Sequence, residues 1–242
     1  MIYRNAIAQL ESLQTKFRKD REYFDQYQGV INKYLEAGFI SVVKEPKVEG
    51  YYMPHFEIKK DSRMTPLRIV FNASAKSKGH KSLNECLLHG PNLVELAYHL
   101  LIRFRLNKYA MLADISKAFH RVLLDPRDAK CTRFLWCEVA GRALTFAFRV
   151  MVFGITASPF LLQQVLNCHF KRDGRPDLAK SFYVDNYLGT FEDLESMRQE
   201  HESVNKILKG AGMPLEGWAS NHLAFDSEKQ WSEPVNVNVL GL

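Results

Sequence analysis

The sequence has no long apolar run and no apolar block at its start. The most apolar stretch, residues 143–162, is interrupted by Arg149, Gly154 and Pro159, whereas a membrane-spanning helix needs about 20 nearly uninterrupted apolar residues. Residues 1–17 lack the apolar core of a secretory signal peptide. We therefore expect a protein with no membrane partner, located in the cytoplasm.

Motifs that mark several common chemistries are missing as well. The eight histidines form no H-E-x-x-H pattern, and neither a G-x-x-x-x-G-K phosphate loop nor a G-x-S-x-G nucleophile elbow occurs. The cysteines show no C-x-x-C spacing, so we expect reduced, mostly buried thiols and neither a zinc site nor a disulfide framework. The cysteines are Cys86, Cys131, Cys137 and Cys168.

The composition is that of a folded globular protein. Of the 242 residues, 46% are apolar and 25% are charged, which excludes an intrinsically disordered or fibrous chain. At this length roughly 70–75% of the surface of the unfolded chain is buried on folding. One large domain or two small ones are therefore expected.

The net charge of +6 is concentrated in one segment. Residues 59–81 carry seven basic side chains and a single acid, Asp61. Because each neutralised phosphate releases condensed counterions, such a cluster suits nucleic acid; a solvated surface loop is the alternative. We take Lys76, Lys78 and Lys81 as candidate nucleic-acid-binding residues. The whole cluster consists of Lys59, Lys60, Arg63, Arg68, Lys76, Lys78 and Lys81.

Hydrophobic periodicity predicts helices and short strands in the first half of the chain. Apolar residues at three- and four-residue steps over 23–35 predict a helix that ends at Gly38. Residues 51–58 and 67–71 are rich in aromatic and branched residues and predict a hairpin that carries the basic cluster. Another amphipathic helix is expected over 93–104.

Strands dominate the prediction for the second half. Residues 109–113 predict a strand, and residues 133–136 and 144–152 predict a pair of strands. Residues 182–191 predict two further strands that meet at the turn-favouring pair Asp185-Asn186.

Two helices are expected to alternate with these strands. Ser158 can cap free amide groups and Pro159 suits the first helical position, so a helix is predicted from residue 158 to about residue 171. Another begins in the acidic pair Glu192-Asp193. The alternation fits an α+β fold, a ferredoxin-like antiparallel sheet with helices on one face. The buried stripe of the first helix is expected to contain Leu161, Val165 and Leu166.

Two aspartates follow strongly apolar strands. Asp114 comes after residues 111–113, and Asp185 comes after residues 182–184. Carboxylates at the ends of adjacent strands can hold Mg²⁺, which takes one or two carboxylates plus substrate phosphates. Two such ions clamp the attacking and leaving oxygens of a phosphoryl displacement. Taken alone, Asp114 could instead cap a helix and Asp185 could form a hairpin turn.

Three segments around these aspartates resemble the palm motifs of reverse transcriptases in their order and spacing. They are residues 113–119 (ADISKAF), 153–160 (FGITASPF) and 183–186 (YVDN). The chain resembles in particular the polymerases of BEL/Pao long-terminal-repeat retrotransposons, over residues 9–242. Segments that resemble the fingers of that family are 52–55, 66–74, 82–84 and 90–93.

The resemblance implies catalytic roles at the strand ends. Asp114 and Asp185 would be the carboxylate ligands of Mg²⁺, or of Mn²⁺ in its place, and the backbone carbonyl of Ile115 would be a further metal ligand. Phe119 matches the aromatic residue that lies under the incoming sugar and rejects a 2′-hydroxyl. An ordinary core phenylalanine is the alternative for Phe119.

The resemblance also implies nucleotide-binding residues. Arg68 matches an arginine of the fingers that binds the triphosphate. Lys59 or Lys60 lies where a lysine is expected at the tip of the fingers. A bidentate guanidinium and an ammonium group both suit a polyphosphate. Phe153 and Gly154 would help to form the nucleotide pocket, since glycine permits a close backbone approach.

Two departures from the family pattern predict weakened chemistry. Asn186 is a degenerate catalytic position, because active relatives have a second aspartate there. A neutral amide in its place is expected to lower the affinity for Mg²⁺. Glu216 and Gly217 stand where relatives commonly have a basic pair, so a positive group near the leaving pyrophosphate is lost.

By resemblance, residues 1–45 are an N-terminal helical segment, residues 46–108 are fingers-like, and residues 109–242 are a palm, with the thumb, connection and RNase H parts absent. The expected function is that of an RNA-directed DNA polymerase that acts on an RNA or DNA template with primer and a deoxynucleoside triphosphate (dNTP), weakened or inactive in this chain. The alternative is a catalytically dead retrotransposon remnant that binds nucleic acid non-specifically. The sequence does not indicate an oligomeric state.

Overall fold

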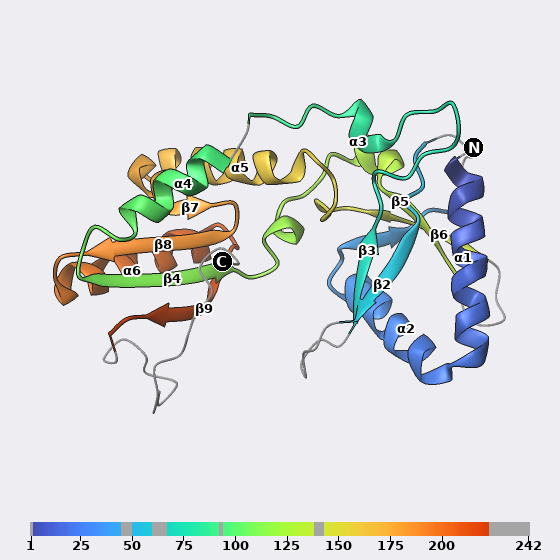
Figure 1. The fold of residues 1–242 in the computed structure, drawn as a ribbon, viewed down its shortest axis with the longest axis horizontal. Coiled ribbons are helices and arrows are strands. Elements are labelled where there is room, and N and C mark those ends of the chain that lie inside the picture. Colours follow the sequence, from blue (N-terminus) through green and yellow to red (C-terminus); the bar gives the residue numbers. More distant parts are fainter. Residues whose placement is uncertain (1, 45–49, 60–66, 92–93, 138–142, 223–242) are drawn as a thin grey trace. The chain divides into compact units, whose positions relative to one another are not determined.

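The computed structural model describes residues 2–44, 50–59, 67–91, 94–137 and 143–222, and its elements form two compact units (Figure 1). Unit 1 consists of Met1–His89 and Val122–Ser158, and unit 2 consists of Gly90–Arg121 and Pro159–Leu242. Each unit combines two stretches that are far apart in the sequence. Residues 122–158, which the sequence assigns to the palm, thus group with unit 1. The functional segments 1–45, 46–108 and 109–242 stay predictions.

Unit 1 begins with two amphipathic helices, α1 (Ile2–Lys19) and α2 (Arg21–Glu36). Asp20 separates them and caps α2, because its carboxylate accepts a hydrogen bond from the amide of Tyr23. The helix predicted over residues 23–35 is confirmed. Its buried face contains Tyr23, Phe24, Tyr27 and Ile31.

Two small antiparallel sheets complete the framework of unit 1. β1 (Ile40–Val42), β6 (Leu144–Phe148) and β5 (Arg133–Trp136) form a sheet in the order β1-β6-β5. β2 (His55–Lys59) pairs with β3 (Leu67–Phe71). The predicted hairpin and the predicted strand pair are therefore both confirmed.

Aromatic side chains fill the space between the helices and sheets of unit 1. Trp136 stacks on Tyr27 with ring centroids 5.0 Å apart, and Phe17 meets Tyr27 edge-on at 5.4 Å. His55 is 3% exposed in the same cluster. Because the carbonyl of Leu135 can only accept, Nε2 of His55 donates to it and Nδ1 accepts from the hydroxyl of Tyr27. A neutral imidazole thus satisfies both of its buried partners.

Two short helical segments lie in the loops of unit 1, α3 (Leu83–Cys86) and η2 (Pro126–Cys131). A capping box opens α3. The side chain of Ser82 accepts from the amide of Glu85, and the side chain of Glu85 accepts from the amide of Ser82. This box fixes the chain directly after Lys81.

Unit 2 is built on an antiparallel sheet of four strands in the order β7-β8-β4-β9. The strands are β4 (Tyr109–Ile115), β7 (Phe182–Tyr183), β8 (Asn186–Phe191) and β9 (Leu215–Ser220). The helical elements are α4 (Val94–Arg103), η1 (Ala118–Arg121), α5 (Ser158–Arg172), η3 (Pro176–Ser181) and α6 (Leu194–Gly210). Throughout the part of the chain that the structure describes, no helix is long and apolar enough to cross a membrane.

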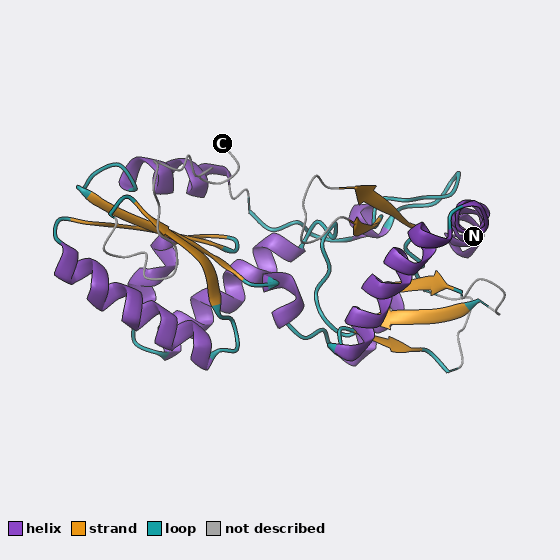
Figure 2. Ribbon diagram, turned by 90° about the horizontal axis from the view of Figure 1, so that it is seen from below, coloured by secondary structure: helices purple, strands orange, loops and turns teal. Residues whose placement is uncertain are grey.

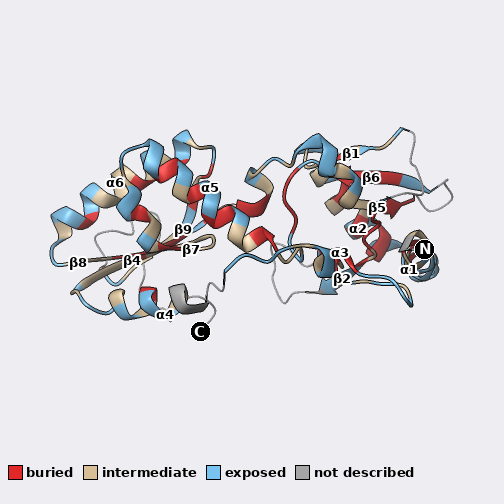
Figure 3. Cartoon of the chain, turned by 90° about the horizontal axis from the view of Figure 1, so that it is seen from above, coloured by how far each residue is buried: buried red, intermediate tan, exposed pale blue. Residues whose placement is uncertain are grey.

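The connections of unit 2 give the predicted ferredoxin-like order. The chain runs through β4, α5, β7, β8, α6 and β9. Figures 2 and 3 show α5 and α6 on one side of this sheet, with the buried residues facing it, and α4 on the other side. The α+β fold is therefore confirmed. The prediction of helices on one face holds for α5 and α6, whereas α4 lies on the opposite face. The pair β5 and β6, which follows β4 in the sequence, belongs to the sheet of unit 1.

The buried face of α5 differs from the prediction. Leu166 is buried as expected, but its partners in the stripe are Leu162 and Phe170. Leu161 and Val165, which were predicted to be buried, are 44% and 37% exposed. The helix therefore packs through the row of Leu162, Leu166 and Phe170, which lies next to the row that the sequence predicts to be buried.

Two local predictions are also wrong. The hydroxyl of Ser158 donates to the carbonyl of Val152 at 2.9 Å, and among the described residues it accepts no capping hydrogen bond. The turn between β7 and β8 is formed by residues 184–185, because Tyr183 pairs with Asn186 across the hairpin. The turn therefore lies one residue earlier than the sequence predicts.

The cysteines are all free, as expected. Only Cys137 is buried, whereas Cys131 is half-buried and both Cys86 and Cys168 are exposed. The prediction of mostly buried thiols is therefore wrong, because two of these residues lie on outward-facing positions of α3 and α5.

Candidate active site

The ends of three strands of unit 2 meet at one edge of the sheet, and Asp114 lies at that edge. The strand register pairs Asp114 with Asn186 of β8 on one side and with Glu216 of β9 on the other. The amide of Ile115 donates to the backbone carbonyl of Asp185 at 2.8 Å. This bond holds the turn that carries Asp185 beside the end of β4. The two predicted catalytic aspartates and the degenerate position thus lie together.

The turn that presents Asp185 is strained. Val184 has a φ of +57°, a left-handed conformation that costs a β-branched residue about 1–3 kcal/mol. Its amide donates to Oε1 of Gln163, a residue of α5 that is 3% exposed. Strain of this kind persists where the surrounding structure holds a functional group in place. Gln163 is thus a positioning residue that the sequence analysis missed, since no pattern distinguishes it from its neighbours.

Burial raises the pKa of both aspartates, and repulsion by neighbouring carboxylates adds to the shift of Asp114. The pKa of Asp114 rises to about 6, mainly because burial disfavours its charged form and further because the charges of Asp185 and Glu216 are close. The pKa of Asp185 is also raised by burial, and a hydrogen bond from the Asn186 amide at 3.1 Å opposes that shift. Among the described residues no Lys or Arg forms an ion pair with these carboxylates. A bound cation would relieve their repulsion.

The oxygen donors at this edge fit Mg²⁺. Asp114 and Asp185 supply carboxylates, and Asn186 supplies an amide oxygen. Mg²⁺ prefers such hard donors and typically shares its remaining positions with water and substrate phosphates. Over the described ranges, no three His, Cys, Asp or Glu side chains are gathered closely enough to hold a metal ion by themselves. The donor set therefore suits an ion that a phosphate-bearing substrate helps to hold.

Phe119 lies in η1 of unit 2, shortly after Asp114 in the chain, and is 5% exposed. Burial of the ring is compatible with a residue that underlies a bound sugar and with an ordinary core residue. The proposed selection against a 2′-hydroxyl therefore stays a prediction.

The residues predicted to bind the triphosphate belong to β2 and β3 of unit 1. Arg68 is exposed on β3, directly opposite Ile58 of β2, and it forms no ion pair with a described residue. Its guanidinium is thus available to an anion. Lys59 is the last residue of β2, but its side chain lies outside the described part of the chain, as does the whole of Lys60.

The loop that carries Phe153 and Gly154 is anchored within unit 1. Phe153 is 54% exposed, and Gly154 has a φ of +90° with its ideal Cβ position only 2.8 Å from the carbonyl oxygen of Phe71. Only glycine fits there without a shift of the backbone. Asn84 holds the loop, because its Nδ2 donates to the carbonyl of Gly154 and its Oδ1 accepts from the amide of Thr156, both at 2.9 Å. Asn84 belongs to the fingers-like segment 82–84, but the sequence alone does not indicate this role.

The three predicted nucleic-acid-binding lysines line one open cavity of about 550 Å³ in unit 1. Lys76 forms an ion pair with Glu85 at 2.6 Å, and this partner, together with hydrogen bonds from Ser82, lowers the pKa of Glu85 to about 2. Lys78 and Lys81 are exposed and form no ion pair with a described residue. The charges that remain for phosphate are therefore mainly those of Lys78 and Lys81.

The fold of the chain is shared with viral reverse transcriptases. A crystal structure of the prototype foamy virus protease-reverse transcriptase, a CSH mutant, is similar with a TM-score of 0.61 and 19% identity, over 78% of this chain and 23% of that chain. The foamy viral enzyme in complex with an RNA/DNA hybrid is similar with a TM-score of 0.62 and 22% identity, over 79% of this chain and 23% of that chain. The same enzyme in complex with double-stranded DNA is similar with a TM-score of 0.61 and 22% identity, over 79% of this chain and 36% of that chain.

The chain spans about a quarter to a third of the length of these viral proteins. At such identities the likeness shows the fold. No curated protein sequence matches the chain. The family model described as reverse transcriptase (RNA-dependent DNA polymerase) matches residues 58–217. This match includes both aspartates, the strained turn and most of both units, and the chain therefore belongs to the reverse transcriptase family.

Proposed function

We propose that this chain is the polymerase part of an RNA-directed DNA polymerase of the BEL/Pao retrotransposon type, acting in the cytoplasm. Residues 109–242 would be its palm, and residues 46–108 a fingers-like segment that follows the N-terminal helical segment. The observation that carries the proposal is the pair Asp114 and Asp185, held at one sheet edge by the hydrogen bond from Ile115 to Asp185. The family match supports the same reaction.

In the proposed reaction the 3′-hydroxyl of a primer attacks the α-phosphorus of a dNTP that is paired with the template. The bond from that phosphorus to the pyrophosphate leaving group breaks. Mg²⁺ or Mn²⁺ held by Asp114, Asp185 and the carbonyl of Ile115 would acidify the attacking hydroxyl and neutralise charge on the phosphates. The turn at Val184, braced by Gln163, keeps the Asp185 carboxylate in place for this role.

The remaining predicted residues bind and select the nucleotide in this proposal. Arg68 binds the triphosphate together with Lys59 or Lys60, since the guanidinium of Arg68 is free of described ion pairs. Phe119 selects deoxyribose. Phe153 and Gly154 contribute a loop whose backbone conformation Asn84 fixes.

The activity is expected to be weak in this chain. Asn186 contributes no charge to the metal site, and Glu216 places a negative charge where the leaving pyrophosphate needs a positive one. The test is incorporation of one nucleotide into a primer on an RNA template, with the full chain in excess and with Mg²⁺ or Mn²⁺. We expect slow incorporation of only the complementary dNTP. A primer that stays unextended while the protein is bound to the hybrid would overturn the proposal.

A second candidate function is sequence-independent binding of nucleic acid by a catalytically dead remnant. It is favoured by the lysine-lined cavity of unit 1, in which Lys78 and Lys81 have no described ion-pair partner. The foamy viral enzymes have been seen with an RNA/DNA hybrid and with double-stranded DNA. Binding of these duplexes would precede catalysis in the first proposal and would be the whole function in the second.

Replacing Lys78 and Lys81 together by Gln is expected to reduce the salt dependence of duplex binding. Each lost phosphate contact lowers the slope of log K against log[salt] by about 0.9 on B-form DNA, so the double variant should lose about 1.8. Fluorescence anisotropy over a salt series measures this slope. The matched control changes the exposed Lys206 and Lys209 of α6 to Gln and should leave it unaltered. Equal slopes in all three proteins would show that the cavity does not bind phosphate.

A further inference from the structure

Three polar side chains form a row across the sheet edge of unit 2. Asp114 of β4 lies directly opposite Asn186 of β8 and Glu216 of β9. Figure 1 shows the end of β4 between the beginnings of these two strands. Directly opposite residues of antiparallel strands carry their side chains on the same face, with Cβ atoms roughly 4.5–5.5 Å apart. Glu216 is thus a direct cross-strand neighbour of Asp114, as Asn186 is on the other side.

This row lies on the face of the sheet that points away from α5. Phe170 of α5 contacts Phe182, and Phe182 contacts Tyr187, each with ring centroids 5.2 Å apart. The side chain of Tyr187 is therefore directed toward the helix. Asn186 precedes Tyr187 in β8, and successive residues of a strand point to opposite faces, so Asn186 and its row are directed away from α5.

The pairing of β4 with β9 contains a bulge next to Glu216. Asp114 pairs with Glu216, but Leu112 pairs with Ala219, so two residues of β9 lie opposite one residue of β4. Gly217, inside the bulge, has a φ of +66°. Glycine adopts this conformation without steric cost, as the first residue of one common bulge type does.

The bulge separates the directions of Glu216 and Trp218. The ring of Trp218 contacts His201 of α6 at 4.4 Å and Tyr187 at 5.8 Å, so it is directed toward the helices. In a regular strand, residues two apart share a face, and Glu216 would then be directed toward the helices as well. With the bulge, an exposed Glu216 lies on the face of Asp114.

The charge of Glu216 is uncompensated and close to the aspartates. Glu216 forms no hydrogen bond or ion pair with a described residue, and its charge is one of those that raise the pKa of Asp114. Asn186 contributes no charge, and its amide group donates to the carboxylate of Asp185. The edge thus has three carboxylates, although the turn between β7 and β8 supplies only one of them.

We propose that Glu216 is the third carboxylate of the metal site and replaces the one that Asn186 lacks. This proposal rests on the proposed function, because that function assigns the metal to Asp114 and Asp185. In the described structure the three carboxylates are not gathered into a single group. The Glu216 side chain is long and unrestrained by described partners, so rotation about its bonds can bring its carboxylate toward Asp114 without breaking an interaction. The ligand would be a divalent cation that prefers oxygen donors, such as Mg²⁺ or Mn²⁺.

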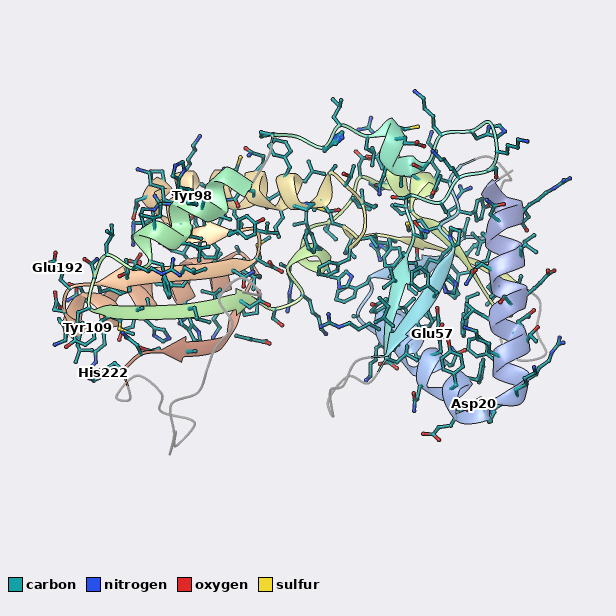
Figure 4. All side chains as sticks on the ribbon, in the orientation of Figure 1. Asp20, Glu57, Tyr98, Tyr109, Glu192 and His222 are labelled. Carbon is teal, nitrogen blue, oxygen red and sulfur yellow. The ribbon has the colours of Figure 1, made fainter. Side chains whose placement is uncertain are left out.

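Binding of Mn²⁺ to the full chain tests this role without any dependence on activity. The concentration of free Mn²⁺, followed by its EPR signal, gives the dissociation constant for the wild type, Glu216→Gln, Asn186→Asp and the double variant. The control is Glu192→Gln, because Glu192 is an exposed glutamate at the other end of the same sheet, beside the paired residues Phe191 and Tyr109 (Figure 4). Asp114→Asn reports whether the site itself exists.

We expect Glu216→Gln to weaken Mn²⁺ binding about tenfold, because affinity follows the number of charged ligands. In the Asn186→Asp background the same change should weaken it less than about twofold, since the restored aspartate supplies the missing charge. Glu192→Gln should bind as the wild type does. If Asp114→Asn loses binding but Glu216→Gln does not, or if Glu216→Gln costs the same in both backgrounds, the role of Glu216 is refuted and the proposed function stands. If Asp114→Asn binds like the wild type, the metal site of the proposed function fails.

Discussion

Replacement of Asp114 by Asn is expected to lower the rate of single-nucleotide incorporation by about 1000-fold or more, to the background of the assay. The substitution keeps the shape of the side chain and removes one negative charge from the edge where Asp114, Asp185 and Glu216 lie together. Loss of a ligand that fixes a catalytic metal removes several kcal/mol of transition-state stabilisation, which corresponds to a factor of this size. The rate is measured on an RNA template with protein in excess, so that weak binding does not limit it.

The matched control for this prediction is Asp128→Asn. Asp128 is an exposed carboxylate of η2 in unit 1, and its neutralisation changes the net charge of the chain by the same amount. The control should extend the primer like the wild type, and both variants should bind the RNA/DNA hybrid with unchanged affinity. A rate for Asp114→Asn within tenfold of the wild type would show that this carboxylate does not hold the metal.

The positions of Asp114 and Asp185 at strand ends could be predicted because local sequence determines them. Asp114 and Asp185 each follow a run of apolar residues, and burial of such runs leaves the next polar residue at the end of a strand. Neither the proximity of the two aspartates nor the hydrogen bond from the amide of Val184 to Gln163 is indicated by any local sequence pattern. These features depend on the pairing of β4 with β8 and on the packing of α5, which join residues far apart in the sequence.

The errors in α5 and at the hairpin turn have the same origin. Leu161, Leu162, Val165 and Leu166 give the helix two adjacent apolar rows, and periodicity alone does not decide which row is buried. The sheet of unit 2 selects the row of Leu162 and Leu166. At the turn, propensity favours an Asp-Asn pair, but strand pairing imposes a left-handed conformation on a valine instead. Tertiary contacts therefore override local preference at both places.

The strand β9 is not predicted from the sequence, because its bulge interrupts the alternation of buried and exposed residues that marks a strand. Buried Leu215 and the inward Trp218 are three residues apart, a spacing that fits no regular strand. The bulge at Gly217 explains this spacing, and it also places Glu216 on the same face of the sheet as Asp114. From the sequence alone, Glu216 was interpreted as a harmful loss of positive charge. The register adds a second consequence, since the same residue increases the negative charge available to a metal ion.

Acidification is expected to destabilise unit 1 through His55. The pKa of this imidazole is lowered to about 4 because burial disfavours its charged form, whereas in the unfolded chain it titrates near 6.5. Between these values the unfolded state binds more protons than the folded state, so the stabilising contribution is complete above pH 6.5 and is lost as the pH falls toward 4. The difference corresponds to about 3 kcal/mol. Urea unfolding, followed by the tryptophan fluorescence to which the neighbouring Trp136 contributes, measures the free energy of unfolding at each pH.

The contribution of His55 is isolated by comparison with His55→Gln. This variant has no titrating group at the site, so its free energy of unfolding relative to the wild type should improve by about 3 kcal/mol as the pH is lowered from 7.5 to 4. At pH 7.5 the variant should be less stable than the wild type, because the hydrogen bonds to Tyr27 and Leu135 are altered. His80→Gln, a change at an exposed histidine of the same unit, should follow the wild type at every pH. Parallel curves for the wild type and His55→Gln would mean that His55 accepts its proton in the folded protein as readily as in the unfolded chain. The buried cluster around Trp136 would then tolerate a charge on His55. The two satisfied hydrogen bonds of the neutral imidazole and its aromatic surroundings argue against such a charge.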